Sequence, residues 1–210
     1  MKFRNILFNI ILLSIFSISN IIFSKGSLAM DDKDILIMRL KDGEVRIQLD
    51  SNIAPNHVKR IKELTNKGFY NGVVFHRVID GFMAQTGDPT GTGMGGSGQN
   101  IKAEFSNKPH TRGAISMARA QSPDSADSQF FIVLADSPHL NNQYTIFGYV
   151  VSGMEFVDKI KKGDPRRNGL VDDPDRIIEM YLEVLPRNQV DSNNNADHYN
   201  LRGDSPRQTQ

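Results

Sequence analysis

The chain has 210 residues, of which 39% are hydrophobic and 23% are charged, the composition of an ordinary soluble globular protein. It contains no cysteine, which excludes disulfides, thiol catalysis and cysteine-based metal sites. The first 29 residues carry three basic groups and no acidic one, which leaves 22 basic and 24 acidic groups in residues 30–210. That balance excludes the strongly basic surface of a nucleic-acid-binding protein.

Residues 1–29 have the pattern of a targeting segment. Lys2 and Arg4 form a positive start, an uncharged apolar stretch follows, and Ser27-Leu28-Ala29 supplies the small residues of a signal-peptidase site. We therefore expect export to a periplasm-like compartment, with a mature chain that begins at Met30. The alternative is an uncleaved membrane anchor, because the uncharged run approaches the ~20 residues that span a bilayer.

After residue 33 the pattern becomes that of a small β-rich protein. Val45, Ile47 and Leu49 alternate with polar residues, which predicts a half-buried strand. Residues 41–43 (Lys-Asp-Gly) predict a hairpin turn between this strand and one at residues 35–38. Six further strands are predicted at residues 73–78, 82–86, 113–117, 129–134, 144–150 and 177–185.

The last of these strands has a regular alternation. Ile178, Met180, Leu182 and Val184 are expected on one face and the intervening polar residues on the other.

Two helices interrupt the strands. Residues 55–67 have apolar side chains at helical spacing, with proline in the first turn and glycine just after the end. Residues 154–161 predict a second, short helix. Many short strands with only two helices predict a mainly β fold, a closed antiparallel barrel whose open ends the helices cap.

Residues 187–210 are polar, with too few apolar side chains to bury a core, and we expect a disordered tail. The tail contains Arg202-Gly203-Asp204, a tripeptide associated with integrin binding that also arises frequently by chance. The expected organisation is therefore a signal segment at 1–29, one domain at 30–186 and a tail at 187–210.

Motifs for other chemistries are absent or incomplete in this sequence. Residues 91–96 match the dinucleotide-binding pattern G-x-G-x-x-G, but no helical pattern follows them, as that motif requires. A tight surface loop with glycines at positive φ is the expectation. The five histidines lack zinc-ligand spacing, and no G-x-S-x-G serine motif is present. We therefore expect no metal, no cofactor and no serine-hydrolase site.

Residues 75–88 (FHRVIDGFMAQTGD) concentrate distinctive side chains. On neighbouring strands, Arg77 and Gln85 would project near Phe82 and Met83, forming an apolar pocket with a cation at its rim. Periodicity alone leaves open a simpler interpretation, a core hairpin with a surface salt bridge.

This run resembles the signature of the cyclophilins, and the likeness extends across residues 34–186. Further matching stretches are residues 113–118, 128–132 and 144–148. The chain thus resembles a cyclophilin-type peptidyl-prolyl cis/trans isomerase of the bacterial, exported form. The resemblance implies an eight-stranded antiparallel barrel capped by two helices, with the site on its outer face.

The resemblance also assigns residues by position. Arg77 corresponds to the catalytic arginine. Gln85 would hold the substrate backbone, and the main chain at Ala118 would pair with the bound peptide. The side chains that would hold the substrate proline ring are Phe82, Met83, Phe131 and Leu140.

Three positions of the expected binding groove depart from many family members. Arg119 stands where many carry Asn, His139 where many eukaryotic members carry Trp, and Tyr144 where they carry His. His139 and Tyr144 look like the variant common in bacterial members. These departures predict weak binding of cyclosporin-type inhibitors but leave the reaction as expected, with the Tyr144 hydroxyl as a donor to a substrate carbonyl.

The expected function is therefore isomerisation of X–Pro bonds during folding of exported proteins. Proline-containing polypeptides are the expected partners, with no nucleic acid, and with membrane contact only if residues 1–29 stay attached. Two alternatives are a binding module that kept the groove but lost turnover, against which Arg77 argues, and an interaction protein that acts through its tail.

Overall fold

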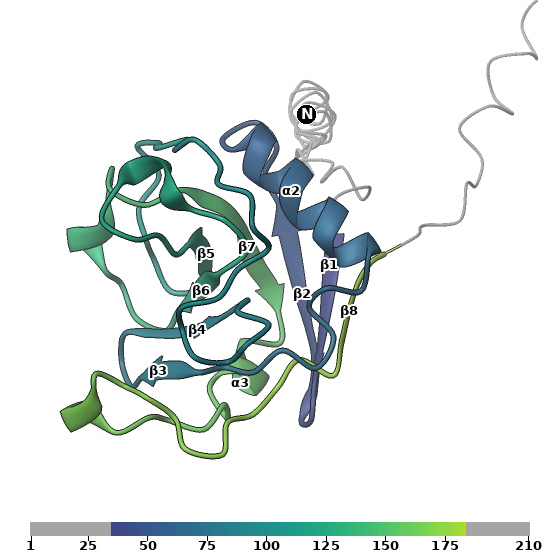
Figure 1. Cartoon of the computed structure of the whole chain (residues 1–210), viewed down its shortest axis with the longest axis vertical. Coiled ribbons are helices and arrows are strands. Elements are labelled where there is room, and N and C mark those ends of the chain that lie inside the picture. The colour runs from purple at the N-terminus through teal and green to yellow at the C-terminus, as the bar shows by residue number, and fades with distance from the viewer. Residues whose placement is uncertain (1–34, 184–210) are drawn as a thin grey trace, which may run out of the picture. The chain divides into compact units, whose positions relative to one another are not determined.

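A computed structural model describes residues 35–183 of the chain. The expected signal segment and the expected tail lie outside the described residues. The described strands form one eight-stranded antiparallel sheet in the order β3-β4-β6-β5-β7-β2-β1-β8 (Figure 1). None of the helices within residues 35–183 combines the length and apolar character needed to cross a membrane.

The eight strands appear in the chain order expected from the sequence, as β1 (Ile35–Leu40), β2 (Gly43–Leu49), β3 (Arg77–Ile79), β4 (Met83–Thr86), β5 (Ala114–Met117), β6 (Phe130–Val133), β7 (Ile146–Ser152) and β8 (Glu179–Leu182). The helices are α2 (Pro55–Asn66), α3 (Met154–Val157) and the 3-10 turns η2 (Pro123–Ser125), η3 (Pro138–Leu140) and η4 (Pro165–Arg167).

The sheet is open and curled, so the prediction of a closed barrel is wrong. Strands β3 and β8 are its two edges and do not pair with each other. Instead, the segments that precede them meet: Val74 and Arg176 form an isolated bridge, and the Gly72 N–H donates to the Ile177 oxygen at 2.7 Å. Because residues 72–75 bond to this neighbouring segment, the predicted strand at 73–78 forms a ladder only from Arg77 onward.

The helix α2 begins at Pro55 as predicted, because proline fixes φ for a first turn and needs no N–H partner there. Gly68 follows its end with φ of 67°, a left-handed conformation that glycine adopts without steric cost. Val58, Ile61 and Leu64 are buried along one face. The second helix, α3, is shorter than predicted and ends at Val157.

The alternation predicted for the last strand fails at its start. Ile178 is 50% exposed, whereas its neighbour Ile177 is fully buried. The Ile178 N–H donates to the Arg39 oxygen of β1 at 2.9 Å, but the paired register with β1 begins at Glu179, and residue 177 is bonded to the 72–73 segment instead. The period of two therefore applies only within the ladder, where Met180 is buried as expected.

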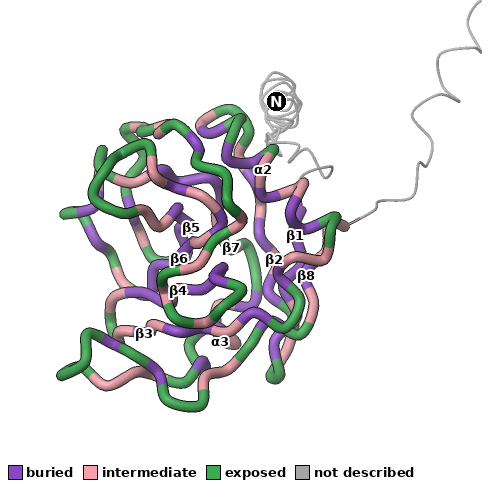
Figure 2. Tube along the Cα trace, viewed as in Figure 1, coloured by how far each residue is buried: buried purple, intermediate pink, exposed green. Residues whose placement is uncertain are grey.

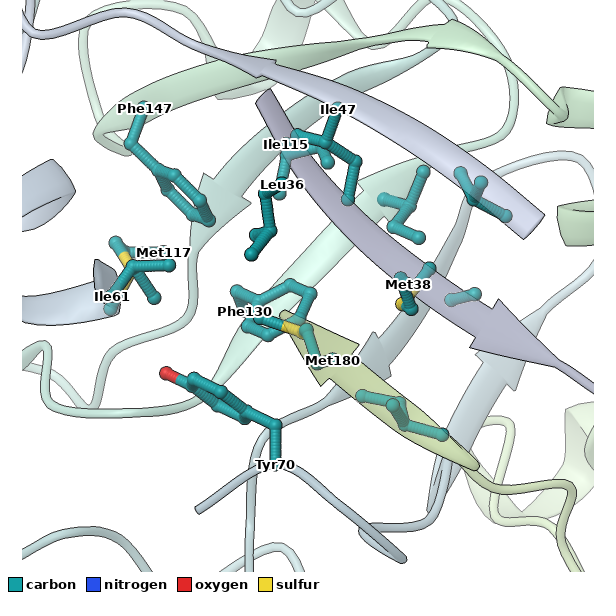
Figure 3. Packing of buried hydrophobic residues seen from close by; sticks show 14 of the residues in the cluster. Leu36, Met38, Ile47, Ile61, Tyr70, Ile115, Met117, Phe130, Phe147 and Met180 are labelled. Atoms are coloured by element: carbon teal, nitrogen blue, oxygen red, sulfur yellow. The ribbon is translucent and has the colours of Figure 1, made fainter. Parts of the chain in front are cut away.

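The main core lies on the inner face of the curled sheet, and buried positions are concentrated along the strands while most exposed positions lie in the loops (Figure 2). Side chains from both halves of the sheet converge there with Ile61 of α2 (Figure 3). Tyr70, Phe130 and Phe147 form edge-to-face aromatic contacts, with ring centroids 5.6 and 5.9 Å apart. This core holds strands β4, β5 and β6 in place, and those strands build the site on their other face.

Candidate active site

A second apolar cluster, called here the outer cluster, takes the alternate side chains of β4, β5 and β6. Its buried members are Met83, Ala114, Phe131, Val133, Leu140 and Ile146. Phe82, Ala118 and Tyr144 are partly buried against it. All the side chains expected to hold a proline ring therefore lie in one cluster on the outer face.

The aromatic side chains of the outer cluster contact one another at its edges. The rings of Phe131 and Tyr144 meet edge to face, with centroids 5.7 Å apart. Phe82 lies against the exposed His139 ring at 5.3 Å, and His139 belongs to the same short turn, η3, as the buried Leu140. These contacts form a wall of aromatic rings beside the buried residues, which suits a flat apolar ring such as that of proline.

Arg77 stands at the edge of this cluster, on the edge strand β3. It lies directly opposite Gln85 in the β3–β4 register, and its Nη1 donates to Gln85 Oε1 at 3.1 Å. Nη1 also lies 3.9 Å from Met83 Sδ. Two further donors bond to Asn168: Nε to the backbone oxygen and Nη2 to Oδ1, both at 3.0 Å. The sequence prediction of a cation at the pocket rim is thus matched by the geometry.

The charge of Arg77 is not neutralised by an acidic partner. Among residues 35–183 no carboxylate forms an ion pair with it, and its hydrogen-bond acceptors are amide and peptide oxygens. Burial lowers the pKa of Arg77, but a guanidinium titrates so far above neutral pH that it remains charged. The simpler interpretation of a hairpin with a surface salt bridge at Arg77 is therefore wrong.

A chain of amide groups continues from Arg77 to the glycine-rich loop. Because a guanidinium can only donate, Gln85 must present its oxygen to Arg77 and its NH2 to Gln129 Oε1, which lies 2.9 Å away. Gln129 then donates to the backbone oxygens of Gly93 and Gly95 at 3.0 and 2.8 Å. Each amide has its orientation fixed by the preceding one.

The glycine-rich loop is organised by a fully buried carboxylate, Asp88. It accepts hydrogen bonds from Thr90, from the Gly93 N–H at 2.6 Å and from the Gly95 N–H at 3.1 Å. Burial alone would raise the pKa of Asp88, but these bonds outweigh it and lower the pKa to about 2. Gly91, with φ of 70°, and Gly93, with φ of 85°, confirm the predicted positive-φ loop.

A groove of about 370 Å³ lies between this loop and the segment after β5. Its lining residues are Gln85, Gly93, Met94, Gly95, Gly96, Asn100, Ala118, Arg119, Ala120, Ser125, Asp127 and Gln129. The groove therefore shares Gln85, Ala118 and Arg119 with the site expected from the sequence. Within the described part of the chain, no group of three or more His, Asp or Glu side chains could hold a metal ion.

Arg119 connects two segments beside the groove. Its guanidinium carbon lies 4.7 Å from the centre of the Tyr144 ring, a cation–π contact. Nε donates to the Gln143 oxygen at 3.1 Å, and Nη1 donates to the Ala120 oxygen at 3.0 Å. Arg119 therefore joins the 119–121 segment to the segment that carries Tyr144.

Behind the outer cluster lies a buried polar group that the sequence did not suggest. His110 stacks on Phe131 with centroids 6.5 Å apart, and its Nε2 lies 3.1 Å from Ser116 Oγ. The Ser116 hydroxyl donates to the Thr145 oxygen at 2.9 Å. Burial lowers the pKa of His110, so the ring is neutral at pH 7 and supports Phe131 without adding charge.

Two residues that touch the expected site were also missed. Gln129 was predictable in principle, because it lies two residues before Phe131 on one face of the strand predicted at 129–134, and Phe131 pairs with Gln85. Asn168 had a weaker signal: Asn168-Gly169 is a common turn dipeptide, but nothing local indicates that its turn reaches Arg77.

Comparisons with known proteins agree with this geometry. A family profile described as "Cyclophilin type peptidyl-prolyl cis-trans isomerase/CLD" matches residues 35–182. A probable peptidyl-prolyl cis-trans isomerase from Brucella suis is 51% identical over 168 residues, which cover 74% of this chain and 86% of that protein. Peptidyl-prolyl cis-trans isomerase B of Bacillus subtilis is 48% identical over 128 residues, covering 60% and 89%.

The fold also matches solved structures. A cyclophilin-type isomerase of Cryptosporidium parvum, crystallised in the presence of the dipeptide Ala-Pro, superposes with a TM-score of 0.66 at 29% identity. The match covers 72% of this chain and 99% of that one. With the family profile spanning the whole curled sheet and both helices, the chain belongs to the cyclophilin-type peptidyl-prolyl cis-trans isomerases.

Proposed function

We propose that this isomerase assists the folding of exported proteins, and that Arg77 is its catalytic residue. Rotation about a peptide bond meets a barrier of ~18–20 kcal/mol because the C–N bond is partly double. For X–Pro bonds the two isomers differ by only ~0.5–1 kcal/mol, so the reaction is slow but nearly balanced. No bond breaks, and an enzyme need only stabilise the twisted state.

The observation that carries the proposal for Arg77 is its charge at the edge of an apolar cluster, where no carboxylate of residues 35–183 pairs with it. In the twisted state conjugation is lost, and the prolyl nitrogen gains an available lone pair. A guanidinium N–H can donate to that lone pair, whereas the planar amide nitrogen offers little to accept it. Arg77 would then bind the transition state more strongly than either ground state, as catalysis requires.

The other site residues would fix everything except the rotating bond. Phe82, Met83, Phe131 and Leu140 would hold the proline ring by apolar contact. The Ala118 N–H is already bonded to the Gln129 oxygen at 2.9 Å, so its carbonyl oxygen is the group left to pair with a bound chain.

Gln85 and Tyr144 would complete the contacts. Gln85 uses one NH2 proton on Gln129 and keeps the other for the substrate backbone. Tyr144 would donate its hydroxyl to a substrate carbonyl. A cyclophilin-type isomerase of Cryptosporidium parvum was crystallised in the presence of Ala-Pro, which supports proline-containing peptides as ligands of this fold.

The proposal of a role in export rests on residues 1–29, with their positive start, apolar run and Ser27-Leu28-Ala29 site. The full-length gene product would be expressed in a bacterial host, and its cell fractions analysed by mass spectrometry. We expect a periplasmic protein that begins at Met30. Full-length protein in the membrane fraction would instead establish the anchor.

The folding role is tested on the protein recovered from the periplasmic fraction. It is added to the refolding of a denatured exported protein whose slow phase is limited by proline isomerisation. The native protein should accelerate that phase and Arg77→Ala should not. Acceleration by neither protein would show a binding module without turnover, and equal acceleration by both would show that Arg77 is not the catalytic residue.

A further inference from the structure

The guanidinium of Arg77 is held from two sides, and one of them lies far away in the sequence. Gln85 holds it from the neighbouring strand at 3.1 Å. Asn168 holds it with two oxygens of a single residue, the backbone carbonyl on Nε and Oδ1 on Nη2, both at 3.0 Å. Asn168 therefore contributes more hydrogen bonds to this side chain than the strand partner does.

The backbone at Asn168 is suited to this arrangement. Asn168 follows the turn η4 in the left-handed conformation, with φ of 55° and ψ of 34°, a region that asparagine tolerates better than most residues. Gly169 follows with φ of 79°, and a Cβ there would lie 2.5 Å from Ile79 Cγ1. The loop can therefore lie directly against β3 only with glycine at this position.

Backbone hydrogen bonds on both sides of Arg77 fix this loop to β3. The Val78 N–H donates to the Gly169 oxygen at 2.8 Å, and the Val171 N–H donates to the His76 oxygen at 3.1 Å. The loop position thus does not depend on the Asn168 side chain, so the side chain can be removed without moving the loop.

The geometry points to Asn168 as a positioning residue for Arg77. Its two neutral oxygens fix the plane of the guanidinium beside the outer cluster, and they do so without the counter-charge that an acidic partner would bring. This inference rests on the proposed catalytic role of Arg77, and it adds a second requirement, that Arg77 acts only in the orientation set from residue 168.

The test uses three variants of the full chain. Asn168→Gly removes Oδ1 but keeps the backbone oxygen and the left-handed conformation. Asn168→Asp keeps an oxygen at the same place. Asp173→Gly is the matched control, because Asp173 also has a positive φ, 50°, and an exposed side chain, 3.8 Å from Lys161 and not bonded to Arg77. Each is measured for kcat/KM, for peptide affinity and for exchange of a bound Ala-Pro peptide by NMR.

For Asn168→Gly we expect kcat/KM and the bound exchange rate to fall about tenfold, because misplacing a catalytic group by about an ångström costs up to 10²-fold. Peptide affinity should change less than twofold. The Arg77 side-chain N–H resonances should broaden or shift in this variant. Asn168→Asp restores the oxygen on Nη2 but adds the counter-charge that Asn168 avoids, so it should recover the native Arg77 N–H resonances and only part of the lost rate. Asp173→Gly should match the native protein throughout.

Two results would overturn the inference in distinguishable ways. If Arg77→Ala slows the bound exchange but Asn168→Gly does not, the catalytic role stands and the positioning role is wrong. If Arg77→Ala leaves the exchange unchanged, the proposed role of Arg77 itself fails. A purely structural role for Asn168 would instead lower the melting temperature and leave the bound exchange rate at its native value.

Discussion

Strands β4, β5 and β6 separate two apolar regions that are built differently. In each strand alternate residues face opposite sides, so Ala84, Ile115 and Phe130 join the inner core, whereas Met83, Ala114 and Phe131 join the outer cluster. The inner core is a continuous packing of residues from the whole sheet and α2. The outer cluster has only six buried members and is bordered by charged and amide side chains.

The difference shows how one sheet serves stability and function separately. The inner core consists of buried residues packed against one another, so a loss of volume there leaves a cavity that the surroundings fill only in part. The outer face ends at half-buried rings and at Arg77, whose hydrogen-bonding groups are partly solvated. Substitutions on the two faces should therefore change different measurable quantities, even at adjacent positions of one strand.

The largest expected effect comes from adjacent phenylalanines of β6. Phe130→Ala should lower the free energy of unfolding by about 3–5 kcal/mol, because Phe130 is fully buried between Tyr70 and Phe147. Phe131→Ala should cost roughly 2 kcal/mol, since the outer cluster can relax toward the groove.

Urea unfolding measures the free energy of unfolding of both alanine variants. A peptide isomerisation assay then measures kcat and KM for each of them. Phe131→Ala should raise KM strongly. If Phe130→Ala does not fold, Phe130→Leu takes its place in the assay. A folded variant at Phe130 should keep native kinetics. Equal destabilisation by both alanine variants would show that the two faces are one core.

The next largest effect is expected at Arg77. Arg77→Ala should reduce kcat/KM by about 10²–10³, the loss typical of one transition-state donor. Arg77→Lys should recover little, because an ammonium keeps the charge but lacks the planar fork that Gln85 and Asn168 hold.

Peptide binding and thermal melting are the controls for Arg77. The melting temperature should stay near the native value, since Arg77 has no ion pair among the described residues and its acceptors can bond to water. A fall in affinity that accounts for the whole loss of kcat/KM would show that Arg77 binds all states alike.

Much of the fold followed from local patterns. The positions of the eight strands along the chain, the start of α2 at Pro55 and the positive-φ glycines at 91 and 93 all depend on residues close in sequence. Whether the sheet closes into a barrel does not depend on residues close in sequence. Whether residues 73–75 continue β3 or bond to residues 175–177 is decided by a pairing about 100 residues apart, which no periodicity contains.

The same division applies to the site. The residues of one hairpin, Arg77 and Gln85, were predictable because the register places them opposite each other. Resemblance supplied Phe131, Leu140 and Tyr144 of the outer cluster, whereas Ala114, Val133 and Ile146 were not assigned to the site. Asn168 and His110 were not found, since each reaches the site through a loop whose path is set by tertiary packing.

A smaller effect is expected at Asp88, which organises the loop that bonds Gln129. Its pKa of about 2 lies below the unfolded value of about 3.9, so its stabilisation is fully present above about pH 4 and is lost as the pH falls toward 2. That difference is worth about 2–3 kcal/mol. Asp88→Asn should lose this amount at pH 7, because its NH2 would face the N–H groups of Gly93 and Gly95.

Urea unfolding of both proteins at pH 7, 4 and 2.5 isolates the contribution of Asp88, since all other carboxylates are shared. The gap between native protein and Asp88→Asn should close as the pH falls. A gap that stays constant from pH 7 to pH 2.5 would assign the loss to packing rather than to the carboxylate charge.

The smallest effect concerns His139 and cyclosporin-type inhibitors, for which the sequence predicts weak binding. His139 is exposed, and its ring contacts Phe82 at 5.3 Å, so a larger ring at this position would extend the outer cluster. An indole adds both apolar area, at ~25 cal/mol per Å², and an N–H donor. His139→Trp should therefore tighten inhibitor binding about five- to tenfold, roughly 1 kcal/mol, and change kcat/KM for a short peptide less than threefold.

His139→Phe is the matched control, because it adds apolar area without the donor and should recover only part of the gain. Isothermal titration of the three proteins separates the two contributions. Native protein that already binds as tightly as His139→Trp would show that the imidazole is no impediment and that the prediction of weak binding is wrong.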